Sequence, residues 1–429
     1  MFHPLLPMIP RFRHRLRPLL VALCWPVALL AQPPAVDASI EFLYGHHELF
    51  PSAIVCFTGE SKYAPFDKDQ LGDKKGVISA KIKSPAAKST ARVTIHPTAF
   101  FAESSVTVEL AEDGKNYHVA PWVLWDVEKI AALKQPIANL VVKVTVVVND
   151  GAPRDFYEKI IVHSVNDWLR SYIPRGAYLP ADVDPPPSET NAKFMAAAYV
   201  NENNPQVDRV ITLTGFKQGK LTALNGYVNA GSVQTTTPKA SVDEAELSGI
   251  YEALRVMQFR YAALSQPSVI SLAGSRGGVE SQYVRLMGDA IESRQANGVE
   301  TAAVLAAVYR KMMLHTVLIL FINKDTGQND VLLGIYRSRG SDPKDLIVLD
   351  PRALGTGDYA KAKKDGEAKF TRHRKYLVPS EVAEEDRIPN ERSGYLWIDI
   401  DEARSNGILP VPEPASERDL RGRPVEKDR

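Results

Sequence analysis

The chain has 429 residues, of which 45% are apolar and 24% are charged, and this composition is ordinary for a globular protein. Its net charge is +1, so the chain does not have the strong basic excess that is typical of proteins that bind nucleic acid. The length is sufficient for two or three domains.

The first 31 residues have the pattern of a secretory signal peptide. Four arginines between positions 11 and 17 form a basic start, and the apolar run over residues 18–31 is too short to span a bilayer as a helix. We therefore predict that residues 1–31 are removed and that the mature protein is exported, either to the periplasm or outside the cell. The sequence predicts no transmembrane segment in the mature chain.

Loss of the signal peptide also decides the cysteine chemistry. If Cys24 leaves with it, Cys56 is the remaining cysteine, so the mature chain has no internal disulfide. Cys56 lies in the apolar run Ile54-Val55-Cys56-Phe57, and we expect it to be a buried, inert core residue. The cores must therefore be large enough to stabilise the fold without a crosslink.

Residues 38–173 have the short alternating pattern of a β domain. The clearest strand is Leu140–Asn149, where valines at every second position share one face. The turn Asn149-Asp150-Gly151 then leads into a return strand. The expected strands are Ser39–Leu43, Ser52–Phe57, Ala91–His96, Ser105–Leu110, Tyr117–Ala120, Leu140–Asn149 and Phe156–Val162. With one helix over Val127–Leu133, this pattern predicts an immunoglobulin-like β-sandwich.

A proline-rich segment over residues 174–190 predicts an extended linker to a second domain over residues 191–411. There, Ser241 as N-cap and Glu244 three positions later predict a helix that runs to about Leu264. Further helices are expected over Phe194–Asn201, Val207–Leu213, Val299–Met313, Asp358–Asp365 and Glu402–Ser405, and strands over His315–Ile322, Val331–Tyr336, Leu346–Leu349 and Tyr395–Ile400. Residues 412–429 predict a disordered tail.

The second domain contains three short motifs, which lie in chain order at the start of a helix, the start of a strand and the end of another strand. Asn297-Gly298-Val299-Glu300 opens a helix that is apolar almost all round, Asn329-Asp330-Val331-Leu332-Leu333-Gly334 begins a strand, and Leu349-Asp350-Pro351 ends another. This order of motifs, with a buried helix followed by the strands of an antiparallel sheet, resembles that of the exported bacterial transglutaminase-like proteins of the papain-like superfamily. That resemblance implies an α+β domain of the same fold after the β-sandwich.

The same resemblance implies a degenerate active site. Gly298 stands where the family has its nucleophilic Cys, Asp330 stands where it has the His, and Asp350 alone keeps a plausible residue type. A helix N-terminus helps to hold a thiolate, but Gly298 has no side chain to supply one. We therefore expect no catalytic residues, no cofactor and no metal, and a role as a pseudoenzyme that binds a protein, a peptide or another cell-envelope ligand.

Two alternatives stay open. Glu300, Asp330 and Asp350, with His315 nearby, could form a rebuilt acid–base site of a hydrolase or transferase. Alternatively, the β-sandwich could bind carbohydrate or a cell surface through Trp122 and Trp125, although core packing is the commoner fate of such residues.

Two other motifs carry less chemistry. His46-His47-Glu48 is a weak metal motif, because adjacent residues of a strand point to opposite faces. Residues 274–278 read Gly-Ser-Arg-Gly-Gly, which does not match a nucleophile elbow, and are expected to form a loop.

Overall fold

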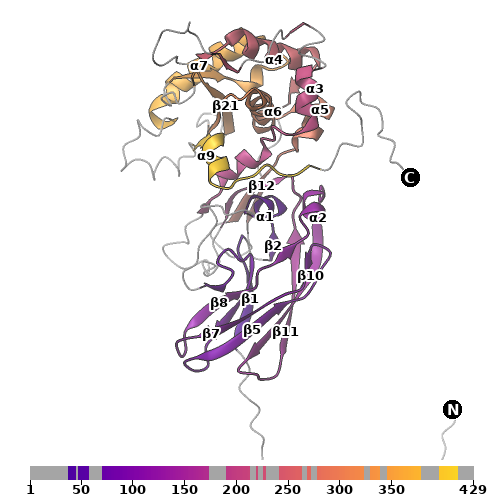
Figure 1. Cartoon of the computed structure of the whole chain (residues 1–429), viewed down its shortest axis with the longest axis vertical. Coiled ribbons are helices and arrows are strands. Elements are labelled where there is room, and N and C mark those ends of the chain that lie inside the picture. The colour runs from indigo at the N-terminus through magenta and orange to yellow at the C-terminus, as the bar shows by residue number, and fades with distance from the viewer. Residues whose placement is uncertain are drawn as a thin grey trace, which may run out of the picture. The chain divides into compact units, whose positions relative to one another are not determined.

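The described part of the chain is a mixed α+β structure, with strands dominating the first half and helices dominating the second (Figure 1). The computed structural model describes residues 37–44, 47–57, 70–172, 190–212, 219–220, 226–228, 241–262, 268–271, 278–322, 329–338, 345–377 and 396–413. The predicted signal peptide, nearly all of the linker and most of the tail lie outside these residues.

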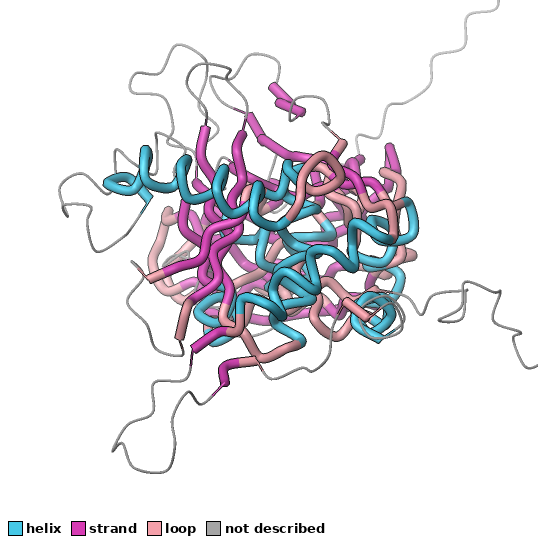
Figure 2. Tube along the Cα trace, turned by 90° about the horizontal axis from the view of Figure 1, so that it is seen from above, coloured by secondary structure: helices cyan, strands magenta, loops and turns pink. Residues whose placement is uncertain are grey.

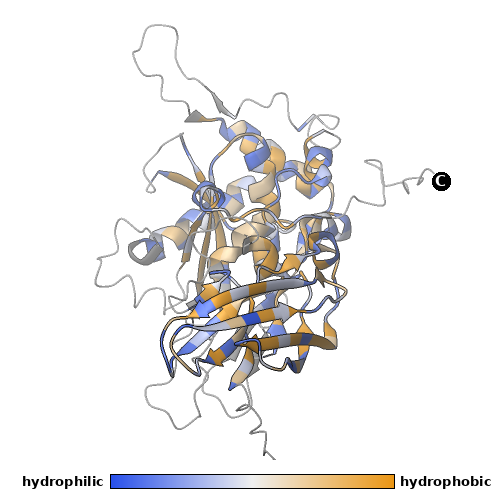
Figure 3. Cartoon of the chain, turned by 60° about the horizontal axis from the view of Figure 1, so that its bottom comes forward, coloured by the Kyte–Doolittle hydropathy of each residue, from blue (hydrophilic) through white to orange (hydrophobic). Residues whose placement is uncertain are grey.

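Two sheets make up the N-terminal region. The first has the order β1 (Ala38–Phe42), β4 (Ile78–Lys83), β8 (Asn116–Ala120), β3 (Gln70–Gly72). The second has the order β2 (Glu48–Leu49), β11 (Arg154–Val162), β10 (Ile137–Val148), β5 (Ser89–Ile95), β7 (Ser104–Leu110). Their strands alternate between hydrophilic and hydrophobic residues (Figure 3), and the buried residues of both sheets belong to one core. A small pair joins β6 (Phe101–Ala102) to β9 (Leu124–Trp125).

One predicted strand of this region is wrong. Residues Ser52–Phe57 belong to a helix, α1 (Pro51–Phe57), whose residues 51–56 are all buried. A short apolar run has no polar alternation to distinguish a strand from a buried helix, and Pro51 is well suited to the first helical position. The predicted helix over Val127–Leu133 is confirmed as α2 (Val127–Ala131), which Asp126 caps.

A mixed group of short strands follows. One sheet has the order β13 (Thr190–Asn191), β12 (Asp167–Tyr172), β18 (Gly278–Tyr283), β17 (Ser268–Ser271), and it pairs segments more than a hundred residues apart. Two further pairs join β14 (Tyr227–Val228) to β15 (Ser241–Val242), and β16 (Arg260–Tyr261) to β19 (Gln295–Ala296).

The helices of the described C-terminal region include six that overlap predicted helices, mostly with different bounds, and two that do not. They are η1 (Lys193–Tyr199), α3 (Pro205–Arg209), α4 (Glu244–Val256), α5 (Met287–Ser293), α6 (Gly298–Lys311), η3 (Pro351–Ala353), α7 (Tyr359–Leu377) and α9 (Ile400–Ser405). Ser241 is not the N-cap of α4, because it lies in β15 and pairs with Val228 of β14. Asp243 caps the helix instead. The predicted helix over Asp358–Asp365 is shorter than the observed one, because α7 continues to Leu377.

The sheet that positions the candidate site is antiparallel and has the order β22 (Leu346–Leu349), β21 (Asn329–Tyr336), β20 (Thr316–Ile322), β23 (Leu396–Asp399). Its two faces bury different clusters. Val331, Leu333 and Ile335 belong to the core that contains α6. Leu332 and Tyr336 belong to a second cluster with Phe370 of α7. Thus α6 covers one face, and α7 runs across the strands on the other (Figure 2).

No helix in the described ranges combines the length and the apolar character that crossing a membrane requires.

Candidate functional site around the start of helix α6

The N-terminus of α6 is held by a complete capping box. The Asn297 side chain accepts a hydrogen bond from the Glu300 N–H at 2.9 Å, and the Glu300 carboxylate accepts one from the Asn297 N–H at 2.8 Å. Gly298 is the first residue of the helix, as the sequence predicts, and it is half-buried. A Cβ added to Gly298 would meet Val331 Cγ2 at 3.7 Å, which is an ordinary van der Waals contact, so the position has room for a side chain.

The residue of β21 that lies against Gly298 is Val331, not Asp330. Successive residues of a strand point to opposite faces. Val331 belongs to the core on the α6 face, whereas Leu332 belongs to the cluster on the α7 face. Asp330 therefore shares the α7 face with Leu332. Asp350, which follows Leu349 of the α6 face, lies on the α7 face by the same alternation.

Asp330 and Asp350 are joined by a shared arginine. Arg352 Nη1 lies 2.6 Å from Asp330 Oδ1, and its Nε lies 3.3 Å from Asp350 Oδ1. Lys369 of α7 forms an ion pair with the other oxygen of Asp350. Both carboxylates are buried, with 5% and 4% of their surface exposed. Burial raises the pKa of Asp350, and the Arg352 guanidinium opposes that rise. Arg352 and Lys369 thus hold the two carboxylates in one charge cluster.

Glu300 is committed to structure. Its side chain is fully buried, and its Oε2 lies 2.9 Å from Arg285 Nη2. Its Oε1 also accepts a hydrogen bond from the Arg285 backbone N–H at 2.7 Å. With the capping bond to Asn297 added, both carboxylate oxygens of Glu300 are in use.

His315 lies away from the other candidates. It precedes Thr316 at one end of β20, whereas Phe321, six residues later, pairs with Asp330. At about 3.3 Å per residue, the two positions are about 20 Å apart along the strand. The His315 ring lies 3.5 Å from Asp401 of α9. The structure therefore brings Asp330 and Asp350 together, and it leaves Glu300 and His315 in other contacts.

Two residues near this cluster are not evident in the sequence pattern. Arg352 directly follows the Leu349-Asp350-Pro351 motif, so its position is a signal that could have identified it. Tyr261 of β16 is half-buried, and burial raises its pKa, with Asp330 and Asp350 adding to the rise and Arg352 opposing it. Tyr261 pairs with Ala296 in β19, directly before the N-cap of α6.

Cys56 is a free cysteine that is fully buried in α1. Burial raises its pKa to about 12, although Arg404 opposes the rise. A thiol in this state is a poor nucleophile at neutral pH.

The remaining candidates do not assemble into a site in the described ranges. Trp122 is 66% exposed, whereas Trp125 packs edge-on against Phe101 at a centroid distance of 5.3 Å, so the two rings do not form one platform. His47 forms an ion pair with Glu158 at 3.3 Å. His46 and residues 274–277 lie outside the described residues. Within those residues, no three His, Cys, Asp or Glu side chains cluster as metal ligands would.

Comparison with known proteins gives no relative from which to transfer a function. No protein-family model matches the chain, and a search of curated proteins finds no significant match.

Proposed function

We propose that the chain is an exported, non-catalytic protein in which an immunoglobulin-like β-sandwich precedes a transglutaminase-like domain, and that it binds a protein, peptide or cell-envelope ligand. The observation that carries this proposal is that a side chain at Gly298 would face Val331, whose Cγ2 lies 3.7 Å from the position of a Cβ there. The family places a thiolate and an imidazole at this junction of helix and strand. Here the two facing groups are a hydrogen atom and an isopropyl group.

The charges near this junction support the same conclusion. A general base must reach the proton that it takes, and a nucleophile must be free to attack. Arg352 and Lys369 pair with Asp330 and Asp350, and Arg285 pairs with Glu300. Carboxylates in such pairs are held by their cations, so a rebuilt acid–base site is the weaker candidate.

The enzymatic half of the proposal is tested by amine-incorporation and peptide-hydrolysis assays on the purified protein, with an active transglutaminase as positive control. We expect no turnover above the buffer rate, because loss of a nucleophile removes several orders of magnitude of rate. Turnover that alkylation of Cys56 abolishes would overturn the proposal. Turnover that survives alkylation but disappears in Asp330→Asn would favour the carboxylate-based hydrolase or transferase.

The binding half is tested by screening a displayed peptide library against the protein and against Gly298→Trp. The indole would fill the half-buried surface beside Val331 and should abolish recovery of the specific peptides. Lys159→Trp, on the exposed face of β11, is the matched control and should recover them. Equal recovery by Gly298→Trp would show that the ligand does not use this junction.

A further inference from the structure

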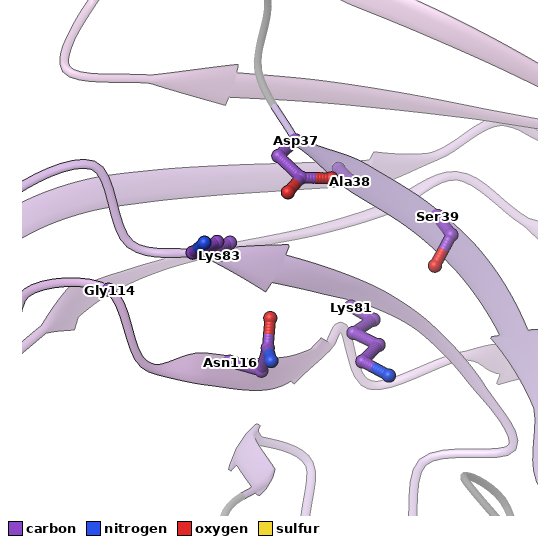
Figure 4. Close-up of a pocket in the computed structure, with 7 residues that line it drawn as sticks. All are labelled: Asp37, Ala38, Ser39, Lys81, Lys83, Gly114 and Asn116. Atoms are coloured by element: carbon purple, nitrogen blue, oxygen red, sulfur yellow. The ribbon is translucent and has the colours of Figure 1, made fainter.

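A polar hollow lies on the four-stranded N-terminal sheet and shares no residue with the site at α6. Its volume is about 430 Å³, which is within the range of small-molecule sites. Its lining residues are Asp37, Ala38, Ser39, Lys81, Lys83, Gly114 and Asn116 (Figure 4). They come from β1, β4, β8 and the residues beside these strands.

Strand alternation places the polar side chains of the hollow on the outer face of the sheet. In β4, Ala80 and Ile82 are buried in the core, so Lys81 and Lys83 between and after them point the other way. Ser39 pairs with Lys81, and Lys83 pairs with Asn116. The hollow is thus built on three neighbouring strands whose other face is fixed by the core.

The lining groups have hydrogen-bonding capacity to spare. Within the described residues, the Lys83 ammonium, the Asn116 amide and the Ser39 hydroxyl make no side-chain hydrogen bond or ion pair. The Lys81 ammonium lies 3.8 Å from a Glu41 oxygen, which is a loose ion pair. A ligand here would meet two cations and several uncommitted donors and acceptors.

We propose that this hollow binds an acidic saccharide unit, with its carboxylate on Lys83 and its hydroxyls on Asp37, Ser39 and Asn116, while Lys81 adds positive charge at the opposite side. Ammonium groups and carboxylates form charge-assisted hydrogen bonds. Carboxylate, amide and hydroxyl side chains supply both donors and acceptors, which is what a sugar hydroxyl needs. The Asp37 carboxylate on the rim would repel a bare polyanion such as phosphate, but it accepts hydrogen bonds from hydroxyl groups.

The absence of aromatic rings from the lining set limits the affinity of a single unit, because no sugar face can stack there. We expect a dissociation constant in the millimolar range, roughly the strength of a few hydrogen bonds. Repetition of the acidic unit along a polysaccharide would then raise the effective affinity. This inference is independent of the proposed function at α6.

The test is titration of the purified protein with trigalacturonate and with the neutral galactose trimer, followed by ligand-observed nuclear magnetic resonance. Binding of the acidic trimer should exceed that of the neutral trimer at least about tenfold, because a charge-assisted hydrogen bond contributes roughly 1.5–3 kcal/mol. Lys83→Met should weaken it by about the same factor. Lys159→Met, which removes an exposed lysine from the other sheet, is the matched control and should leave binding unchanged.

Three binding results would overturn the proposal, and one competition result would do so as well. The binding results are absence of saturable binding, equal binding of the neutral trimer, and equal losses in Lys83→Met and Lys159→Met. Competition by inorganic phosphate at equal concentration would show that the hollow selects charge alone and would also contradict the saccharide assignment. An unchanged thermal unfolding transition confirms that each variant is folded.

Discussion

The two faces of the sheet β22-β21-β20-β23 use charge differently. On the α6 face, the position beside Gly298 is lined by the apolar side chain of Val331, and the carboxylate of Glu300 is bound by Arg285 and the helix cap. On the α7 face, Asp330 and Asp350 form ion pairs with Arg352 and Lys369 in one charge cluster.

The comparison teaches that three residues in the right order along the chain need not converge. An offset of one position in a strand moves a side chain to the other face of the sheet. Asp330 lies at the position along β21 that a base would need, but its side chain is on the α7 face. The side chain on the α6 face at this point is that of Val331. The charges stabilise the docking of α7, and the helix start is left without a reactive group.

The largest expected effect comes from the carboxylate on the α6 face. Glu300→Ala leaves Arg285 without its buried partner and the Asn297 N–H without an acceptor. We expect the free energy of unfolding to fall by about 3–5 kcal/mol, as measured by urea denaturation. Glu109→Ala, on an exposed position of β7, is the control and should change it by less than about 0.5 kcal/mol. Similar values for both variants would contradict the structural role of Glu300.

Raising the pH tests a histidine in the N-terminal region rather than the arginine-held carboxylates of the sheet. His163 Nε2 lies 3.0 Å from Glu48, and its ring stacks on Phe50. Burial alone would lower the pKa of His163, but Asp167 and Glu48 outweigh it and raise the pKa to about 9.

Because this pKa is raised in the folded state, the stabilisation is fully present below about pH 6.5 and is lost as the pH rises through about 9. The difference corresponds to about 3 kcal/mol. Urea denaturation between pH 6 and pH 9, below the range in which the buried Cys56 thiol contributes, should show most of this loss in the native protein and not in His163→Gln. Parallel pH profiles for the two proteins would refute the assignment.

A smaller effect distinguishes the two helices by their glycines. A Cβ on Gly366 of α7 would lie 2.5 Å from the Val348 carbonyl oxygen and 2.7 Å from the Asp350 nitrogen, and a strand backbone cannot move aside. Gly366→Ala should therefore cost about 1–3 kcal/mol of unfolding free energy. Gly298→Ala, with 3.7 Å of clearance, is the matched control and should change it by less than about 1 kcal/mol. A greater cost at Gly298 would reverse the comparison.

The sequence predicts the elements of this region better than their faces. Leu346–Leu349 is found with the bounds predicted, because four consecutive apolar residues end in Asp350-Pro351. The start of α6 is also found within one residue, because the apolar run that begins at Val299 marks it. The second half of α7 is not predicted, because apolar residues are few among its many charged ones and their helical period is hard to recognise.

The face of Asp330 could not be predicted, since it depends on which residues of β21 meet α6 and which meet α7. That choice is set by long-range packing and leaves no mark in the local alternation of a strand that is buried on both sides. The role of Arg352 was missed for a similar reason: its two carboxylate partners are adjacent only after β21 and β22 have paired.

The measurement that tests the account most directly is the pH dependence of thiol alkylation in Gly298→Cys, alone and combined with Val331→His or with Asp330→His. The native protein, with its buried Cys56, gives the background rate. The structure predicts that Val331→His lowers the pKa of the introduced thiol, because a nearby imidazolium stabilises a thiolate, and that Asp330→His leaves it unchanged. A lower thiol pKa with Asp330→His and no effect of Val331→His would contradict the assignment of the two faces.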